Sequence, residues 1–199
     1  MKQVLLFGGT FDPPHIGHLT MAQLAVEQTK ADEVWFLPAP LPPHKLGESH
    51  LPYSLRVDMV KALVHGYNKL SVSTIETFLH GPSYTVDTVM ECQRRYTDVE
   101  FRFLLGSDSL ADLPTWHRAS ELTRLIPFVA ADRSSHLFEQ TVRETRQRLQ
   151  DLRVQVIEMP LLDVSSSWLR ARLNAGEPVC GLVPEGVLKI WHDHFSGRL

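Results

Sequence analysis

The feature that most constrains the fold of this chain is a repeated alternation of short apolar runs with amphipathic segments. Six runs have the length and the bulky apolar content of buried strands: Gln3–Phe7, Glu33–Pro38, Leu70–Ile75, Glu100–Gly106, Leu125–Ala131 and Arg153–Met159. Four segments have the apolar spacing or the opening residues of helices: Ile16 to about Gln28, Leu55 to His65, Tyr84–Tyr96 and Pro184–Phe195. This alternation is typical of βαβ units.

The whole chain is expected to form one α/β domain. Its 199 residues are 43% hydrophobic, which suffices for a full core, and no repeat, low-complexity tract or linker divides them. We therefore expect a doubly wound, Rossmann-like, mostly parallel sheet with helices on both faces. The domain would span residues 1–199, with a helical C-terminal portion from about residue 165. In the helix at Tyr84–Tyr96, the side chains Val86, Val89, Met90 and Gln93 fall on one face.

Charge and cysteine content narrow the classes of partner. A formal net charge of -3 argues against bulk attraction to nucleic acid or to an anionic membrane surface. The N-terminus shows no secretory signal, and no apolar run approaches the 18 residues of a membrane span. Cys92 and Cys180 lie far apart, so we expect free thiols in a reducing cytoplasm. The sequence is compatible with a homo-oligomer.

The stretch from Leu5 to Ala25 predicts a phosphate site. The first strand ends in Gly8 and Gly9, at the edge of a parallel sheet where ligands collect, and glycines let the backbone approach a ligand. Two histidines, His15 and His18, follow at the start of a helix, on one face of it. The unpaired N–H groups of a helix start attract an anion, and both imidazoles could donate to phosphate oxygens.

Two simpler interpretations of the histidines remain open. A histidine at a helix start is often only a hydrogen-bonding residue. A pair three residues apart can also be half of a metal site, which would require a third ligand. Neither accounts for the combination of strand, two glycines, Thr10, Asp12 and Gly17 that surrounds the pair.

A second candidate anion site lies near the end of the chain, in Val164–Arg170, "VSSSWLR". Three hydroxyl residues would open a helix there, and Arg170 would add a planar cationic fork suited to phosphate oxygens. Considered alone, the serines could serve only as helix caps.

Together these two motifs resemble the signatures of the nucleotidylyltransferase superfamily. The form "GGTFDPPH" is most similar to the bacterial nicotinate-nucleotide adenylyltransferases, and the similarity runs from Val4 to about Leu199. The resemblance implies transfer of AMP from ATP to nicotinate mononucleotide, giving deamido-NAD (nicotinate adenine dinucleotide) and pyrophosphate in NAD biosynthesis.

The resemblance also implies roles for individual residues. The catalytic group would be His15, His18, Lys45 and Arg170. ATP would be bound by Gly8, Gly9, Thr10, Phe11, His18, Gly106, Asp108, Ser165, Ser166, Ser167 and Arg170. The acceptor mononucleotide would be bound by Asp12, His15, Lys45, Tyr84, Thr85, Trp116 and Arg133. Mg²⁺ would arrive with ATP, and neither a dedicated metal site nor a tightly bound organic cofactor is expected.

The chain departs from the family pattern at two places. Ala39 stands where the family often has Asn, and "DRSSH" (Asp132–His136) keeps Arg133 but loses the Pro and Gly that often follow it. Two single residues also have ordinary explanations, since Asp108 could be a helix N-cap and Trp116 could be a core residue.

Three other functions are alternatives for this sequence. A related enzyme with another acceptor, such as a phosphopantetheine adenylyltransferase or a cytidylyltransferase, would share the first motif but generally lacks the "GPSYT" and "LPTW" segments found here. A nucleotide-binding sensor would bind ATP without releasing pyrophosphate. A hydrolase using His15 and His18 would contain a metal that a chelator removes.

Overall fold

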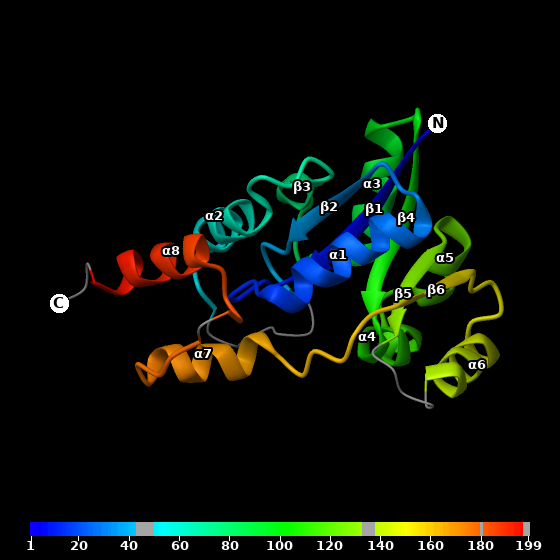
Figure 1. Cartoon of the computed structure of the whole chain (residues 1–199). Helices are drawn as coiled ribbons and strands as arrows, with labels where there is room; N and C mark the ends of the chain where they lie inside the picture. The colour runs from blue at the N-terminus through cyan, green and yellow to red at the C-terminus, as the bar shows by residue number, and fades with distance from the viewer. Residues whose placement is uncertain (43–49, 133–137, 180, 197–199) are drawn as a thin grey trace.

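The computed structural model describes residues 1–42, 50–132, 138–179 and 181–196. Within them, six parallel strands form one sheet in the order β3-β2-β1-β4-β5-β6 (Figure 1). The strands are β1 (Lys2–Gly9), β2 (Glu33–Pro38), β3 (Leu70–Val72), β4 (Val99–Gly106), β5 (Phe128–Asp132) and β6 (Val154–Glu158). The predicted α/β fold with a parallel Rossmann-like sheet is confirmed.

Helices cover both faces of this sheet. They are α1 (Ile16–Thr29), α2 (Tyr53–Val64), α3 (Thr85–Arg95), α4 (Ser107–Asp112), α5 (Ala119–Leu125), α6 (Phe138–Arg148), α7 (Ser166–Asn174) and α8 (Glu185–Ser196), with short 3-10 helices η2 (Ile75–Phe78) and η3 (Leu113–Thr115). Residues of α1, α2, α7 and α8 share one core cluster, and those of α3 to α6 share the other. Figure 1 shows α8 beside α2, at the far end from α6.

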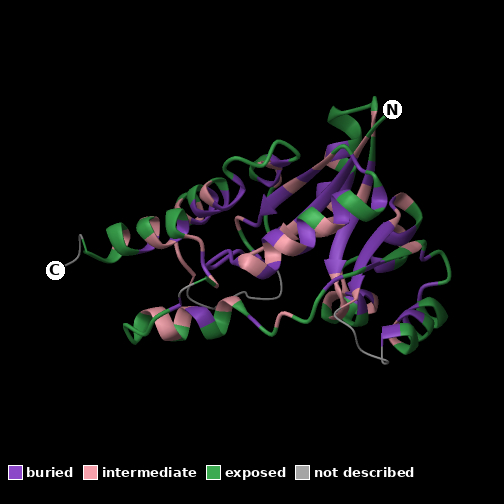
Figure 2. Ribbon diagram, viewed as in Figure 1, coloured by how far each residue is buried: buried purple, intermediate pink, exposed green. Residues whose placement is uncertain are grey.

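Strand alternation divides the core into these two layers. Along β1, Leu5 and Phe7 point to the first cluster, whereas Val4 and Leu6 point to the second. This is the period of two expected of a pleated strand with both faces covered. The inner strands β1, β2, β4 and β5 are accordingly buried over half or more of their length, whereas the edge strand β6 is mostly exposed (Figure 2).

The strand order places a topological switch between β1 and β4. The chain passes from β1 through α1 to β2 on one side, yet β4 pairs with β1 on the other side, with Leu6 opposite Phe103. The connections that leave β1 and β4 therefore diverge beyond Gly9 and Gly106. In open parallel sheets, this divergence creates the crevice in which ligands bind.

Two predicted strands are shorter than expected. The run Leu70–Ile75 pairs only to Val72, because the Ser73 hydroxyl accepts a hydrogen bond from the Ile75 N–H at 3.4 Å and the chain turns into η2. The strand predicted from Leu125 begins at Phe128, because Leu125 ends α5 and Pro127 has no N–H to offer a ladder.

The helix predictions also needed correction. On α3 the buried residues are Val86, Thr88, Val89 and Cys92, whereas Met90 is exposed and the exposed Gln93 donates to the Leu125 carbonyl at 3.2 Å. Pro184 lies directly before α8 and not in its first turn. The Pro184 carbonyl accepts hydrogen bonds from the N–H groups of Val187 and Leu188. No helix was predicted for α4, α5 or α6.

Cys92 is a buried free thiol, and Cys180 lies outside the described residues. No helix in the described part of the chain is long and apolar enough to cross a membrane.

Candidate active site

A cavity of about 270 Å³ opens at the switch point between β1 and β4. Its walls come from the ends of both strands, from the segment after β2, and from the start of α3. The lining residues are Phe7, Gly8, Gly9, Thr10, Ala39, Pro42, Glu76, Ser83, Thr85, Phe103, Leu104, Leu105, Gly106, Ser109 and Trp116. Six of the predicted site residues therefore line one cavity: Gly8, Gly9, Thr10, Thr85, Gly106 and Trp116.

The two glycines of the first motif are required by packing within the protein. A Cβ on Gly9 would lie 2.9 Å from the Phe11 ring, and one on Gly8 would lie 3.2 Å from the Phe103 ring. The sequence analysis attributed both glycines to the close approach of a ligand. The structure supplies a second reason, because both aromatic rings already fill the space beside the backbone. Phe11 itself is buried against Phe7, Phe36 and His18 and does not line the cavity.

His15 and His18 form a reciprocal cap at the start of α1. The Nδ1 atom of His15 accepts a hydrogen bond from the Gly17 N–H at 3.2 Å, and the Nδ1 atom of His18 accepts from the His15 N–H at 3.1 Å. A neutral imidazole that accepts at Nδ1 carries its proton on Nε2. The cap therefore sets the same tautomer on both rings, with Nε2–H as the donor.

This arrangement corrects the expectation that the N–H groups of α1 stay available to an anion. The Ile16 N–H donates to the Leu182 carbonyl at 2.9 Å, and the Gly17 N–H is used by the His15 ring. The His18 N–H contacts the His15 carbonyl at 3.0 Å. The backbone amides of Ile16, Gly17 and His18 are therefore engaged within the protein and are not available to an anion.

The two rings are held close to each other by packing. Their centroids lie 3.8 Å apart, His15 is only 4% exposed, and the His18 ring contacts the rings of Phe7 and Phe11. A Cβ on Gly17 would lie 3.0 Å from the His15 ring, so only glycine leaves room for that ring. Packing thus restricts both imidazoles to one orientation.

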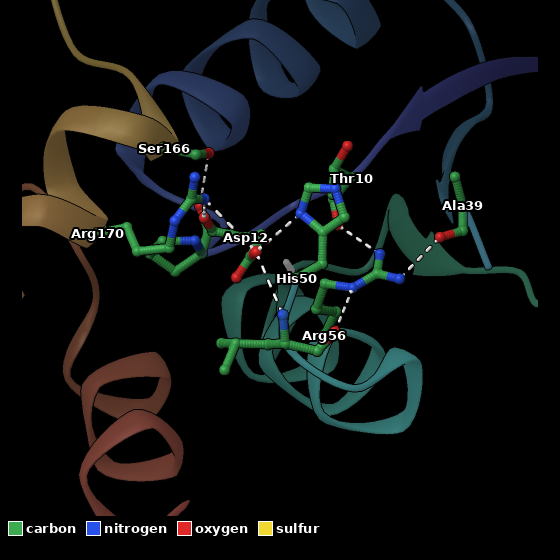
Figure 3. A network of polar contacts seen from close by, with 9 residues as sticks. Thr10, Asp12, Ala39, His50, Arg56, Ser166 and Arg170 are labelled. Carbon is green, nitrogen blue, oxygen red and sulfur yellow. Dashed lines mark hydrogen bonds and ion pairs between the residues drawn. The ribbon is translucent and has the colours of Figure 1, made fainter. Parts of the chain in front are cut away.

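The second motif bonds directly to the first (Figure 3). The Ser166 hydroxyl donates to the Pro13 carbonyl at 2.8 Å, and the Arg170 Nη1 donates to the Asp12 carbonyl at 2.7 Å. Ser165 caps α7 by accepting from the Trp168 N–H at 3.2 Å, as the simpler interpretation expected, and Ser167 is exposed. Two segments that are far apart in the sequence thereby form one polar cluster. Ser166 and Pro13, for example, are separated by 153 residues.

Asp12 lies at the centre of that cluster with no exposed surface. Its Oδ2 atom faces the His50 ring at 3.4 Å, the Leu51 N–H at 3.4 Å and the Arg170 guanidinium at 3.5 Å. It belongs to the loop between β1 and α1 and does not line the cavity. Its predicted contact with the acceptor stays a prediction.

Arg56 was not predicted, and it holds the loops around the cavity together (Figure 3). It is 2% exposed and donates to three main-chain carbonyls, those of Thr10 at 2.7 Å, Ala39 at 2.9 Å and Leu51 at 3.0 Å. Burial lowers the pKa of its guanidinium, an effect that the nearby Asp12 charge opposes. A sequence signal existed, because this arginine shares a helical face with Met59, Val60 and Leu63.

Two of the predicted acceptor residues, Tyr84 and Thr85, lie at the start of α3, and a third, Trp116, shares a cavity wall with Thr85. Thr85 and Trp116 line the cavity, and the Trp116 ring meets Phe103 edge-on at 5.9 Å. Trp116 is partly buried against the second core cluster, so it both packs in the core and faces the cavity. Tyr84 is stacked on His117 with centroids 4.1 Å apart.

Asp108 does not line the cavity. Asp108 is exposed in the first turn of α4, whose N-cap is Gly106, so the alternative that Asp108 caps the helix is wrong. Lys45 and Arg133 fall outside the described residues.

Glu76 is a second residue that the sequence analysis missed. It is 7% exposed, lines the cavity, and accepts from the Thr88 hydroxyl at 2.9 Å through Oε1. Within the described residues, its Oε2 atom is buried without a hydrogen-bond partner. Burial raises the pKa of this carboxyl to about 7, although the Thr88 and Ser83 hydroxyls oppose the shift.

Comparison with known proteins places this site in a family. A model of the cytidylyltransferase-like family matches residues 6–172. A probable nicotinate-nucleotide adenylyltransferase of Exiguobacterium sibiricum is 44% identical over 187 residues, which is 93% of each chain. The nicotinate-nucleotide adenylyltransferase of Bacillus subtilis is 35% identical over 189 residues, or 95% of each chain. The chain belongs to the nicotinate-nucleotide adenylyltransferase family.

The fold of this adenylyltransferase is also that of a solved structure. The Plasmodium falciparum nicotinic acid mononucleotide adenylyltransferase complexed with NaAD superposes with a TM-score of 0.81, covering 98% of this chain and 96% of the other. Their sequences are 17% identical, so this likeness concerns the fold.

The described residues of this adenylyltransferase contain no group of three or more His, Cys, Asp or Glu side chains that could hold a metal ion. His15 and His18 therefore lack the third ligand that the metal-site interpretation requires within that part of the chain. Their contacts with the α1 backbone account for both Nδ1 atoms instead.

Proposed function

We propose that this chain transfers the AMP group of ATP to nicotinate mononucleotide and releases pyrophosphate, in the cytoplasm, forming nicotinate adenine dinucleotide. The single observation that carries the proposal is the junction of the two motifs. The hydroxyl of Ser166 and the guanidinium of Arg170 bond the main chain at Pro13 and Asp12, directly before the capped histidine pair. Side chains that we propose to bind phosphate, from both ends of the chain, are therefore joined in one polar cluster, and Gly9 and Thr10 of the same loop line the cavity.

The chemistry requires alignment more than proton transfer. An oxygen of the acceptor's phosphate, anionic at neutral pH, attacks the α-phosphorus of ATP. The bond from that phosphorus to the oxygen bridging the β-phosphorus breaks, and its electron pair leaves with pyrophosphate. In this scheme the enzyme must hold both phosphates in line and stabilise the charge that grows on the α-phosphate oxygens.

The capped histidines suit that task. Because their Nδ1 atoms accept from the backbone, each neutral ring can offer an Nε2–H whose direction is already set. We assign His18 to the α-phosphate oxygens and place His15 beside it. Arg170 and Lys45 would contact the β- and γ-phosphates.

The remaining roles are assigned to residues that line the cavity and to Asp108. Gly8, Gly9, Thr10 and Gly106, at the strand ends, would face the ATP phosphates and ribose, together with Asp108 of α4. Trp116 offers a flat apolar face and Thr85 a hydroxyl, which suit a pyridine ring with a polar substituent. ATP would bind as its Mg²⁺ complex, with the ion held by phosphates and water.

The proposal is tested by following pyrophosphate release from ATP and Mg²⁺ with three acceptors in turn: nicotinate mononucleotide, nicotinamide mononucleotide and 4′-phosphopantetheine. We expect turnover with the first and at least about tenfold less with the second, since the two differ by one charged substituent worth over 1 kcal/mol of binding. Equal rates with the two mononucleotides would retain the reaction and remove the acid selectivity. Binding of ATP without turnover of any acceptor would support a sensor instead.

A further inference from the structure

Glu76 is a buried acid in the wall of the cavity that the proposed reaction does not use. It comes from η2, beneath the segment that carries Ser83, Tyr84 and Thr85. Its Oε1 atom accepts from the Thr88 hydroxyl, which also donates to the Tyr84 carbonyl at 3.2 Å. The acid is therefore tied to the start of α3, where the acceptor is proposed to bind.

The other oxygen of Glu76 is what makes it unusual. Oε2 is buried and has no hydrogen-bond partner within the described residues. A buried carboxylate oxygen without a partner costs free energy, and the cost falls when the carboxyl takes up a proton. The site can therefore hold either form of the acid, and the balance depends on nearby charge.

The ionisable groups around Glu76 keep their protonation states near pH 7. Tyr53 of α2 and Cys92 of α3 both sense the charge of Glu76. Burial raises the pKa of both, that of Cys92 to about 12. The charge of Arg56 lowers the pKa of Tyr53, and the charge of Glu91 raises the pKa of Cys92. Arg56 and Glu91 both stay charged between pH 6 and 9. Burial brings the pKa of Glu76 to about 7, so Glu76 is the member of this group that changes charge between pH 6 and 9.

We propose that Glu76 is a specificity-determining residue whose carboxyl takes up a proton when an acceptor with an anionic ring substituent binds in this cavity. The inference rests on the proposed function, which brings a carboxylate-bearing pyridine to the wall formed by Thr85 and Trp116. Two like charges beside one small cavity disfavour each other, so the bound acid favours the protonated form of Glu76. A neutral amide substituent imposes no such requirement.

The consequence is a selectivity for acid over amide that weakens as pH rises. Above the pKa of free Glu76, binding of the anionic acceptor must include capture of a proton from solvent. If the acceptor raises that pKa by about one unit, KM for nicotinate mononucleotide increases roughly fivefold or more between pH 6.5 and 9. The KM for nicotinamide mononucleotide changes by less than about twofold, because its ring substituent is uncharged.

The experiment compares wild type with Glu76→Gln, which keeps the shape of the protonated acid and cannot ionise. The KM values of both mononucleotides are measured at saturating MgATP from pH 6.5 to 9. Wild type should show the rise for the acid alone, and Glu76→Gln should show a flat profile. Tyr53→Phe, a neighbouring change that leaves the acid in place, should keep the wild-type profile.

Proton uptake gives a readout that does not depend on turnover. Calorimetric titration of nicotinate mononucleotide at pH 7.5, in two buffers of different ionisation enthalpy, should show uptake of about half a proton by wild type. Glu76→Gln should take up none beyond what nicotinamide mononucleotide causes. Equal uptake by wild type and Glu76→Gln, or a pH profile that the variant retains, would overturn the proposal.

Thr88→Val provides a second variant if Glu76→Gln does not fold. It removes the hydroxyl that stabilises the charged acid, so the rise in KM should move to higher pH. An unmoved rise would contradict the role of Glu76. Failure of the proposed function would be visible separately, as absence of pyrophosphate release by wild type at pH 7.

Discussion

The two ring nitrogens of His18 have separate roles in the proposed reaction. Nδ1 accepts from the His15 N–H and closes the cap of α1, which leaves Nε2 as the donor nitrogen. A capping hydrogen bond is worth about 1 kcal/mol, whereas a preorganised donor to a developing oxyanion is worth about 3 to 4 kcal/mol. The two contributions differ enough in size to be separated by substitution.

His18→Asn should separate them. The Asn side chain can still accept from the His15 N–H but has no donor where Nε2 lies, so kcat should fall about 10² or more while the melting temperature changes little. Steady-state pyrophosphate release and thermal unfolding provide the two measurements. His192→Asn, at an exposed position of α8, is the matched control and should leave both unchanged. An active His18→Asn enzyme would refute the assignment.

Gly17→Ala tests whether packing holds His15 in place. The new Cβ would lie 3.0 Å from the His15 ring and 3.3 Å from Val164, so the ring must move. We expect kcat/KM to fall about tenfold or more, since small misplacements of a positioned group are costly. Gly186→Ala is the matched control, because its Cβ would meet Ala62 at an ordinary 3.5 Å. Wild-type activity in Gly17→Ala would mean that the ring position is unimportant.

At the scale of elements, the site depends on loops held by buried polar groups. Arg56 belongs to α2, and its three acceptors belong to the segments after β1, after β2 and before α2. Figure 3 shows these carbonyls converging on one guanidinium. Irregular segments have few backbone partners of their own, so a buried cation with several donors can fix them relative to one another.

Arg56→Met should therefore destabilise the protein. The apolar stem is retained, but the buried carbonyls of Thr10, Ala39 and Leu51 lose their donor. We expect a loss of about 3 kcal/mol or more in the free energy of unfolding, measured by urea denaturation. The exposed Arg143→Met on α6 should cost less than about 0.5 kcal/mol. Equal stabilities for the two variants would show that the three hydrogen bonds are unimportant.

Glu76 in η2 should make stability depend on pH. Its pKa in the folded protein, about 7, lies above the ordinary value of 4.5, so the folded state binds the proton more tightly. The contribution of Glu76 to the free energy of unfolding is then fully present below pH 4.5 and is lost as pH rises through 7. Glu76→Gln cannot lose a proton there, so its stability relative to wild type should increase across this window by on the order of 3 kcal/mol. Urea midpoints at pH 5 and pH 8 measure the difference, and a constant difference would contradict the shifted pKa.

At the scale of the whole molecule, the sheet gathers functional groups that are distant in sequence. The order β3-β2-β1-β4-β5-β6 sets the ends of β1 and β4 side by side, and α7 returns to the β1–α1 loop through Ser166 and Arg170. The catalytic chemistry proposed here needs that assembly and a nucleotide, but no metal resident in the fold.

Metal removal tests this distinction. The described residues offer no cluster that could hold a metal, so EDTA should leave the melting temperature of the nucleotide-free protein unchanged. The same treatment should abolish pyrophosphate release, and added Mg²⁺ should restore it, because ATP is used as its Mg²⁺ complex. A fall in melting temperature with EDTA alone would instead reveal a structural metal.

The sequence by itself determined the positions of the strands, the class of fold and the motif at the first turn. These features are local: a strand appears as a short apolar run, and the glycines, Asp12 and the histidine pair lie within a few residues of each other. Two failures were local too, since the side-chain hydroxyl of Ser73 and the missing N–H of Pro127 shortened strands.

Only the tertiary structure decided which distant groups share the site. Arg56 shows in the sequence only as an arginine on an apolar helical face, and Glu76 shows no motif, because the roles of both come from partners brought near by chain folding. The first amide of α1, that of Ile16, likewise donates to the Leu182 carbonyl from the far end of the chain. Burial then gave these polar groups their importance, since a hydrogen bond or a charge matters most where water cannot replace it.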